Sequence, residues 1–431
     1  MSPSESEGAP RFAVVGNPEN RRVALFTAAV RAAGLPAPRV VPWTEVLRAG
    51  GAEFAPGETV RLDSPGENAE ADLLLRGVDD PTRVEGSARW YTRFLTAVGG
   101  LRGGVRLDDP GDLAVLFDKR RCHAVLDAAG VPVPSSPTSG PAAAAVGGWD
   151  DVRRLMREHR MPRLFVKLAH GSSASGVLAV ESGGRGRVRA TTSVERAEDG
   201  RLYNSLRIRR YEDERDIAAV VDALAPDGLH MERWVPKASQ HGRAADLRVL
   251  VVAGRATHAV VRTSTAPLTN LHLGGARGDL DVARRAVEAA GGRWSDVLGV
   301  CERAAACFPR TLCVGVDLLP AVGWRRFAVG EVNAFGDLLP RLTGLPGSGA
   351  EGLDTYAAQV AAVLGAPAPA RPYPRTEAPA RSSRPSPPSL PSRPSPPSPP
   401  SLPSSSSSSS LPSLPSRPAP QHRTGPGHAV A

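Results

Sequence analysis

Strand-like apolar runs alternate with helix-like stretches through most of the chain before residue 366. The apolar run at 11–16 predicts a strand that closes on Gly16, and the helical stretch after it ends before Gly34. Further short strands are predicted at 40–41, 60–62 and 73–75. This alternation predicts a small α/β domain over residues 11–110.

A helix predicted at 112–129, with Asp112 as its cap, leads into a second region that is richer in strands. The strand candidates there are 164–168, 177–180, 230–235, 246–252, 257–262, 314–319 and 326–332, and the helix candidates are 279–290 and 295–307. A short loop joins the fourth strand to the fifth and the sixth to the seventh, so each pair predicts a hairpin. We therefore expect an α/β protein with α+β character in its C-terminal part.

Both ends of the chain have the composition of disordered segments. Residues 1–10 contain little apolar surface, and residues 366–431 are rich in proline and serine, including a serine run at 404–410. We expect disorder in both. A solubilising tail is the favoured interpretation of 366–431, and a docking segment for a Pro-binding partner protein is the alternative.

The basic charge of the chain lies mostly in this tail. The whole chain carries a formal charge of +9, and seven arginines against one glutamate place +6 of it in residues 366–431. A nucleic-acid partner is therefore disfavoured. No run of about 18 apolar residues predicts a membrane span, and four scattered cysteines with no secretory leader predict a cytoplasmic protein with reduced thiols.

Lysine is rare in this sequence. Only Lys119, Lys167 and Lys237 occur among 53 basic residues, so each is a candidate for a role that a guanidinium fills poorly. Lys167 ends an apolar strand before the Gly/Ser loop 171–176, whose backbone N–H groups could surround a phosphate, although an ordinary hairpin loop has the same composition. Lys119 lies in the 112–129 helix, where a solvated basic face is the alternative.

Two arginines are expected to converge on neighbouring strands. Asp246 and Arg248 share one face of a strand, and Arg262 comes from the next strand. Their charges would repel unless an anion lies between them, so the pattern suggests a polyphosphate site, although Asp246 could equally neutralise one arginine.

The strongest pattern places oxygen-bearing side chains inside apolar strands. Glu331 and Asn333 share one face of a strand, and Asp317 lies on the neighbouring strand. Carboxylates in an apolar sheet are costly without a cation. Oxygen ligands favour Mg²⁺, with Mn²⁺ as an alternative ion and a structural salt bridge as the alternative explanation.

These segments, in this order, resemble the ATP-grasp superfamily, with ribosomal-protein glutamate ligases and bacterial glutathione synthetases nearest in motif order. The resemblance rests on Asp246-Leu-Arg248, Arg262, Asn270-Leu-His-Leu-Gly-Gly275, Gly315-Val-Asp317 and Glu331-Val-Asn333, and it covers about 112–339. It implies an ATP-grasp fold. The expected domains are 1–10 disordered, 11–110 a pre-ATP-grasp-like α/β domain, 111–235 a linker helix and small subdomain, 236–365 a C-terminal subdomain with the metal site, and 366–431 the tail.

The resemblance also implies roles for individual residues. Lys119, Lys167 and the loop residues Gly171, Ser172, Ser173 and Gly176 would contact the phosphates of ATP, with Glu232, Trp234 and Val235 at the adenine. Mg²⁺ would be held by Asp317, Glu331 and Asn333. Arg248, Arg262 and Asn270 would be catalytic, holding the γ-phosphate and an acyl-phosphate.

The implied activity is ATP- and Mg²⁺-dependent ligation of a carboxylate to an amine or thiol through an acyl-phosphate. Its partners would be a small-molecule or peptide carboxylate and an amine, with a homo-oligomer as an option. The alternatives are an ATP-grasp kinase of a small molecule and a non-catalytic nucleotide-binding scaffold. Two departures from the relatives, Leu268 where they often have arginine and Phe335 after Asn333-Ala, lie near the acceptor and leave the substrate open.

Overall fold

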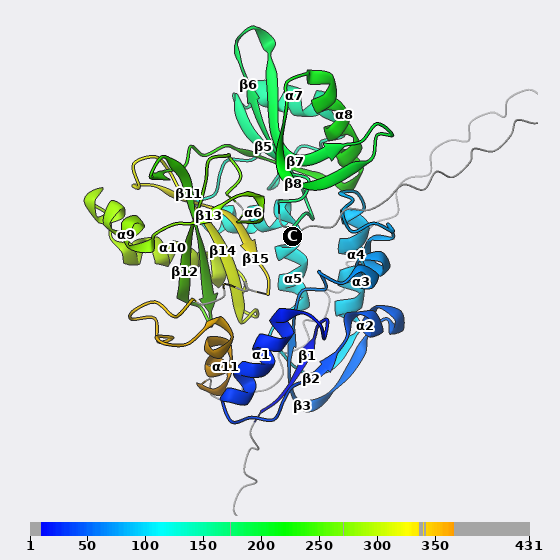
Figure 1. Cartoon of the computed structure of the whole chain (residues 1–431), viewed down its shortest axis with the longest axis vertical. Helices are drawn as coiled ribbons and strands as arrows, with labels where there is room; N and C mark the ends of the chain where they lie inside the picture. The colour runs from blue at the N-terminus through cyan, green and yellow to red at the C-terminus, as the bar shows by residue number, and fades with distance from the viewer. Residues whose placement is uncertain (1–9, 173, 270, 336–338, 340–341, 366–431) are drawn as a thin grey trace, which may run out of the picture. The chain divides into compact units, whose positions relative to one another are not determined.

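The computed structural model describes residues 10–172, 174–269, 271–335, 339 and 342–365 (Figure 1). The predicted disordered segments, apart from Pro10, lie outside these ranges, and so do two predicted site residues, Ser173 and Asn270. The described residues form one parallel sheet, two antiparallel sheets and flanking helices. The predicted α/β class is therefore confirmed. None of the helices in these ranges combines the length and apolar composition needed to cross a membrane.

The N-terminal sheet is parallel, with strand order β2-β1-β3-β4. Its elements are β1 (Arg11–Val15), α1 (Arg21–Ala32), β2 (Arg39–Val41), α2 (Trp43–Ala49), β3 (Ala52–Leu62), α3 (Ala69–Arg76), α4 (Ser87–Gly99) and β4 (Leu101–Arg106). The strand predicted at 73–75 is wrong, because these leucines lie in α3. Asn68 caps α3 by accepting from the backbone N–H of Ala71, and Ala71 and Leu75 are buried one turn apart.

The helix predicted at 112–129 is two helices, α5 (Pro110–Leu116) and α6 (Lys119–Ala128). Asp109, and not Asp112, caps α5, with Pro110 in its first turn. Asp118 caps α6 by accepting from the backbone N–H groups of Arg120 and Arg121. The break makes Lys119 the first residue of α6.

The second sheet is antiparallel, with strand order β8-β7-β6-β5-β9. Its strands are β5 (Arg163–Leu168), β6 (Leu178–Ser182), β7 (Val188–Arg196), β8 (Leu202–Tyr211) and β9 (Leu229–Arg233). The helices α7 (Trp149–Glu158) and α8 (Glu214–Leu224) bury their apolar faces against it, in one core with side chains of its strands. Figure 1 shows both helices beside this sheet.

The third sheet is also antiparallel, with the path β13-β12-β11-β14-β15 and β10 paired to β11. Its strands are β10 (Ser239–Gln240), β11 (Arg243–Val252), β12 (Arg255–Ser264), β13 (Ala276–Arg277), β14 (Cys313–Pro320) and β15 (Phe327–Asn333). The predicted hairpins β11–β12 and β14–β15 are confirmed. The helices α9 (Leu280–Ala289) and α10 (Trp294–Ala306) pack against the sheet (Figure 1).

Two contacts bring later segments back to the N-terminal sheet. The last described helix, α11 (Thr355–Gly365), packs Tyr356 and Val360 against α1 around Phe26. Phe335, just after β15, joins an aromatic cluster centred on Phe94 of α4. The other rings that contact Phe94 are Trp43, Trp90 and Phe117, at centroid distances of 5.6, 5.0 and 4.8 Å.

Removing the Phe94 ring should destabilise the protein strongly. Phe94 is fully buried, so we expect Phe94→Ala to lower the free energy of unfolding by about 3–5 kcal/mol in urea titrations. Leu206, which is 75% exposed on β8, supplies the control, because Leu206→Ala should change this free energy by less than about 0.5 kcal/mol. Equal unfolding midpoints for the two variants would show that the cluster is not packed as described.

Candidate active site

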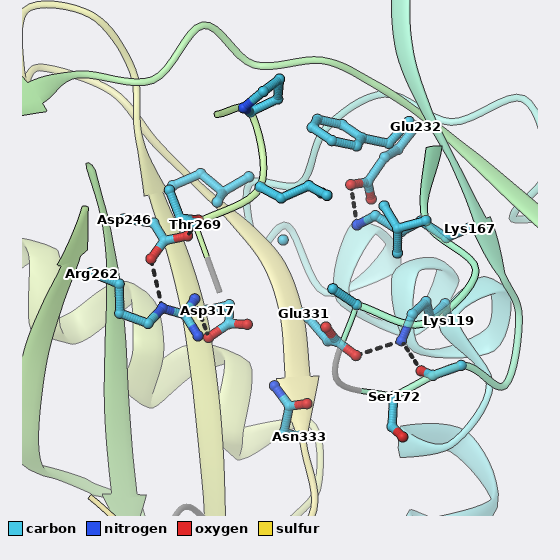
Figure 2. Close-up of a pocket in the computed structure, with 18 of the residues that line it drawn as sticks. Lys119, Lys167, Ser172, Glu232, Asp246, Arg262, Thr269, Asp317, Glu331 and Asn333 are labelled. Atoms are coloured by element: carbon cyan, nitrogen blue, oxygen red, sulfur yellow. Dashed lines mark hydrogen bonds and ion pairs between the residues drawn. The ribbon is translucent and has the colours of Figure 1, made fainter. Parts of the chain in front are cut away.

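One cavity of about 850 Å³, counting the space at its open mouth, collects side chains from the start of α6, from the second sheet and from the third sheet (Figure 2). All three lysines of the chain line it. The other charged side chains that line it are Glu232, Asp246, Arg248, Arg262, Asp317 and Glu331. Five basic groups therefore face four acidic groups, and the cavity is nearly neutral without a ligand.

Strand register explains why the charged groups of the third sheet meet. Asp317 of β14 lies opposite Glu331 of β15 and opposite Arg248 of β11, and Asp246 lies opposite Arg262 of β12. Side chains at opposed positions of antiparallel strands leave the sheet on the same face. Residues that are distant in sequence therefore share one face at the cavity.

Asp317 lies between the two predicted arginines. Arg248 Nε is 2.5 Å from Asp317 Oδ1 and its Nη2 is 3.1 Å from Oδ2, while Arg262 Nη2 is 2.9 Å from Oδ1. Burial raises the pKa of the Asp317 carboxyl, but the two guanidinium charges outweigh burial and lower this pKa to about 2. The arginines do converge as predicted, and the anion between them in this structure is a carboxylate of the chain itself.

Lys167 and Glu232 form a buried ion pair between the neighbouring strands β5 and β9. On the far side of Glu232, His230 Nε2 lies 3.6 Å from Oε2, and His230 Nδ1 lies 3.0 Å from Thr138 Oγ1. Burial raises the pKa of Glu232, but the charge of Lys167 and the hydrogen bond from His230 outweigh it and bring the pKa to about 2. The carboxylate is thus held charged between Lys167 and His230. Burial lowers the pKa of the His230 imidazole, which favours its neutral form.

Lys119 reaches across the cavity from the first turn of α6. Its Nζ donates to Glu331 Oε1 at 2.5 Å and to the carbonyl oxygen of Gly171 at 2.7 Å (Figure 2). Its backbone N–H donates to the carbonyl of Ala169 at 2.9 Å. This residue therefore connects α6, β15 and the start of the Gly/Ser loop.

A fourth charged cluster contains Lys237, which the sequence indicated by its rarity without a specific role, and Thr269, which the sequence did not single out. Lys237 Nζ lies 2.7 Å from Thr269 Oγ1 and 3.3 Å from Asp246 Oδ2, and Arg262 Nε donates to Asp246 Oδ1 at 2.7 Å. Thr269 also donates to Asp246. Burial lowers the pKa of Lys237, although the charge of Asp246 opposes this shift. The rarity of lysine pointed to a functional role for Lys237, whereas no feature of the sequence pointed to one for Thr269.

Some predicted nucleotide contacts do not line the cavity. Gly171 and Ser172 line it, but Gly176, Trp234 and Val235 do not. Trp234 packs its ring on Phe165, 5.2 Å between centroids. Gly176 shapes the loop, because its φ is +67° and a Cβ there would lie 2.5 Å from Leu168 Cδ1.

The predicted metal ligands share the cavity, as all three of Asp317, Glu331 and Asn333 line it. The Asn333 amide nitrogen donates to the Gly315 carbonyl at 3.2 Å, so the amide oxygen is the atom left to act as a ligand. Among the described residues no group of three or more His, Cys, Asp or Glu side chains that could hold a metal ion is found. The predicted donor set differs from such a group, because it is two carboxylates and an amide. Both carboxylates are paired with cationic side chains in this structure. Carboxylate and amide oxygens are hard ligands, so this donor set fits Mg²⁺.

Apolar side chains form one wall of the cavity. Phe165 of β5 and Val177, which precedes β6, meet Leu268, which follows β12, in a small buried cluster, and all three line the cavity. Leu319 of β14 contributes from the third sheet. The wall suits a flat, weakly polar ring beside the charged groups.

No family model matches the chain, and no curated protein matches it. Solved structures do resemble it over most of its length. D-cycloserine synthetase DcsG is 16% identical, with 82% of this chain and 99% of that chain covered and a TM-score of 0.48.

Two further structures carry the ATP-grasp name, the superfamily that the motif order resembles. The ATP-grasp ligase PsnB, complexed with a minimal precursor, is 17% identical, with 82% of this chain and 99% of that chain covered and a TM-score of 0.45. An ATP-grasp RimK domain protein from Sphaerobacter thermophilus is 14% identical, with 82% and 98% covered and a TM-score of 0.44.

The ion pairs of Asp317 should make stability depend on pH. Because the pKa of Asp317 is lower in the folded chain than in the unfolded chain, the stabilisation is complete above about pH 5 and is lost as the pH falls toward 2. We expect the parent to have a higher free energy of unfolding than Asp317→Asn at pH 6, and this difference to shrink by about 1 kcal/mol when the pH is lowered to 3. Urea unfolding measures it.

Asp281 on α9 is the matched control, since its side chain is 67% exposed and forms an ion pair with Arg284 of the same helix. Asp281→Asn should leave the difference from the parent nearly constant over the same pH range. A constant difference for Asp317→Asn as well would contradict the described ion pairs.

Proposed function

We propose that this chain is an ATP-grasp ligase that uses ATP and Mg²⁺ to join a carboxylate to an amine or thiol through an acyl-phosphate. One observation carries the proposal. The motif residues of the second sheet, of α6 and of the third sheet meet in a single cavity, with Lys119 and Lys167 facing Asp317, Glu331 and Asn333. In this proposal 111–235 and 236–365 are the two subdomains that enclose the nucleotide.

The residues that line the cavity support binding of a nucleoside triphosphate. The adenine would lie on the apolar wall of Phe165, Val177 and Leu268. The backbone at the end of β9, where Glu232 lies, would be beside it. The phosphates would extend toward Lys167 and Lys119, whose ammonium groups act as mobile point charges. The backbone of the Gly171–Ser172 turn would cover them.

Phosphoryl transfer needs positioned cations more than a protein nucleophile. Asp317, Glu331 and Asn333 would hold Mg²⁺, which when bound supplies charge neutralisation at the phosphate oxygens. Arg248 and Arg262 would orient the transferring phosphoryl group and then the acyl-phosphate, because their guanidinium groups are already fixed on the same face by Asp317 and Asp246.

The proposed reaction has two steps. A carboxylate oxygen of the acceptor attacks the γ-phosphorus and ADP leaves, which gives the acyl-phosphate. The nitrogen or sulfur nucleophile then attacks the acyl carbon, phosphate leaves, and the nucleophile's proton is lost to solvent. The acceptor carboxylate is either a small molecule or a peptide.

Hydroxylamine distinguishes ligation from the other functions. We expect purified protein with Mg·ATP and pools of carboxylates and amines to release ADP, and added hydroxylamine to divert the acyl-phosphate into a hydroxamate detectable by mass spectrometry. Phosphorylated product without hydroxamate would favour a small-molecule kinase. Nucleotide binding without ADP release across the pools would favour a non-catalytic scaffold.

Loss of the Lys167 ammonium should weaken nucleotide binding. We expect Lys167→Met to raise the Kd for Mg·ATP by about 10–100-fold, because a charge-assisted contact contributes roughly 1.5–3 kcal/mol. Isothermal titration calorimetry measures the Kd directly.

Arg189 provides a control on the same sheet, since it is half-exposed, pairs with Glu181 and does not line the cavity. Arg189→Met should bind Mg·ATP like the parent. Parent-like binding by Lys167→Met would instead rule out this placement of the phosphates.

A further inference from the structure

Lys119 is positioned to change partners without moving its backbone. Its N–H is fixed to the Ala169 carbonyl, and Asp118 caps the helix that begins with it. The ammonium group, at the end of a flexible four-carbon stem, bridges the Glu331 carboxylate and the Gly171 carbonyl (Figure 2). The side chain can therefore swing while the residue stays anchored beside the loop.

The two acidic groups of the predicted metal site are compensated differently. Asp317 is held by two guanidinium groups that come from paired strands, and its side chain is 14% exposed. Glu331 is held by the ammonium of Lys119, and its side chain is 30% exposed toward the cavity. Glu331 is thus the carboxylate that an incoming cation can reach with the smaller disturbance.

Resting on the function proposed above, we propose that Lys119 is an exchangeable counter-ion. It neutralises Glu331 in the ligand-free protein, and a divalent cation that binds Glu331 releases it to the nucleotide phosphates. Before release, ATP and Glu331 compete for one ammonium group. After release, the cation and the ammonium are both available, so cation and nucleotide each strengthen binding of the other.

The same exchange reaches the Gly/Ser loop. When Nζ leaves Glu331 for a phosphate, its donation to the Gly171 carbonyl at 2.7 Å is broken or redirected. Gly171 and Ser172 line the cavity at this end, so release of Lys119 removes one of the contacts that hold the start of the loop. Lys119 thereby couples occupation of the acidic site to a contact at Gly171, where the loop begins.

The exchange makes an unusual prediction, namely that losing a metal ligand tightens metal-free nucleotide binding. In EDTA, Glu331→Gln should bind ATP about tenfold more tightly than the parent, because Lys119 no longer has to leave a charged partner. In the Lys119→Met background the same Glu331→Gln change should alter the Kd less than about twofold. Calorimetric titration of all four proteins with ATP in EDTA completes the cycle.

Glu181→Gln is the matched control, because this acid also pairs with a basic side chain but lies on β6 outside the cavity. It should leave the metal-free Kd unchanged. Circular dichroism spectra like the parent's would show that each variant is folded.

Two results would overturn the exchange while leaving the proposed function intact. One is parent-like or weaker metal-free binding by Glu331→Gln, with the parent still binding Mg·ATP. The other is an equal gain in the Lys119→Met background, which would mean that only the overall charge of the cavity had changed. Failure of the parent to bind Mg·ATP at all would overturn the proposed function, and the exchange with it.

Discussion

Compensation of buried charge is the constraint on which the site depends. Four carboxylates line the cavity with side chains that are between 3% and 30% exposed, and an unpaired carboxylate at the buried end of this range would cost several kcal/mol or be protonated. Each one meets a cation of the chain. The pairs are Glu232 with Lys167, Glu331 with Lys119, Asp317 with Arg248 and Arg262, and Asp246 with Arg262 and Lys237. Removing Lys167 would leave Glu232 buried without its lysine partner, whereas Asp317 and Asp246 would each keep a second cation if one were removed.

The strands set these pairs more than the individual side chains do. Asp317 faces both Glu331 and Arg248 because β14 lies between β15 and β11 in the sheet. An irregularity in the β14–β15 register follows directly after Asp317. Such bulges redirect side chains locally, so the two acids can converge on the cavity instead of remaining strictly parallel across the strands.

Much of this arrangement was readable from the sequence. The period-2 pattern of strands was enough to place Asp317, Glu331, Asn333 and the two arginines on neighbouring strands, and all of them line one cavity. Lysine rarity, a feature of composition alone, indicated all three cavity lysines. The roles assigned to these residues remain predictions, since the structure shows their positions and not their ligands.

What could not be predicted depends on competition between local signals or on long-range contacts. Asp118 looks like an interior residue of one long helix, but its carboxylate forms a cap and starts a new one at Lys119. The three leucines at 73–75 suggest a strand until the Asn68 cap is considered. The contact of Thr269 with Lys237 and Asp246 joins the loop after β12 to the segment between β9 and β10 and to β11, and no periodicity in the sequence indicates it.

The choice between arginine and lysine follows from how each pair must behave. Arg248 and Arg262 hold Asp317 through several planar contacts, which suits a carboxylate that stays in place. Lys119 and Lys167 each hold a carboxylate through a single ammonium on a flexible stem, which suits a partner that can be exchanged. An anionic ligand entering this nearly neutral cavity gains little from overall attraction. Such a ligand binds by taking the place of a carboxylate that already pairs with a cation of the chain. A lysine ammonium on a flexible stem gives up its carboxylate at lower cost than a guanidinium held through several planar contacts. A chain that uses arginine almost everywhere else would therefore have a physical reason to keep lysine at these positions.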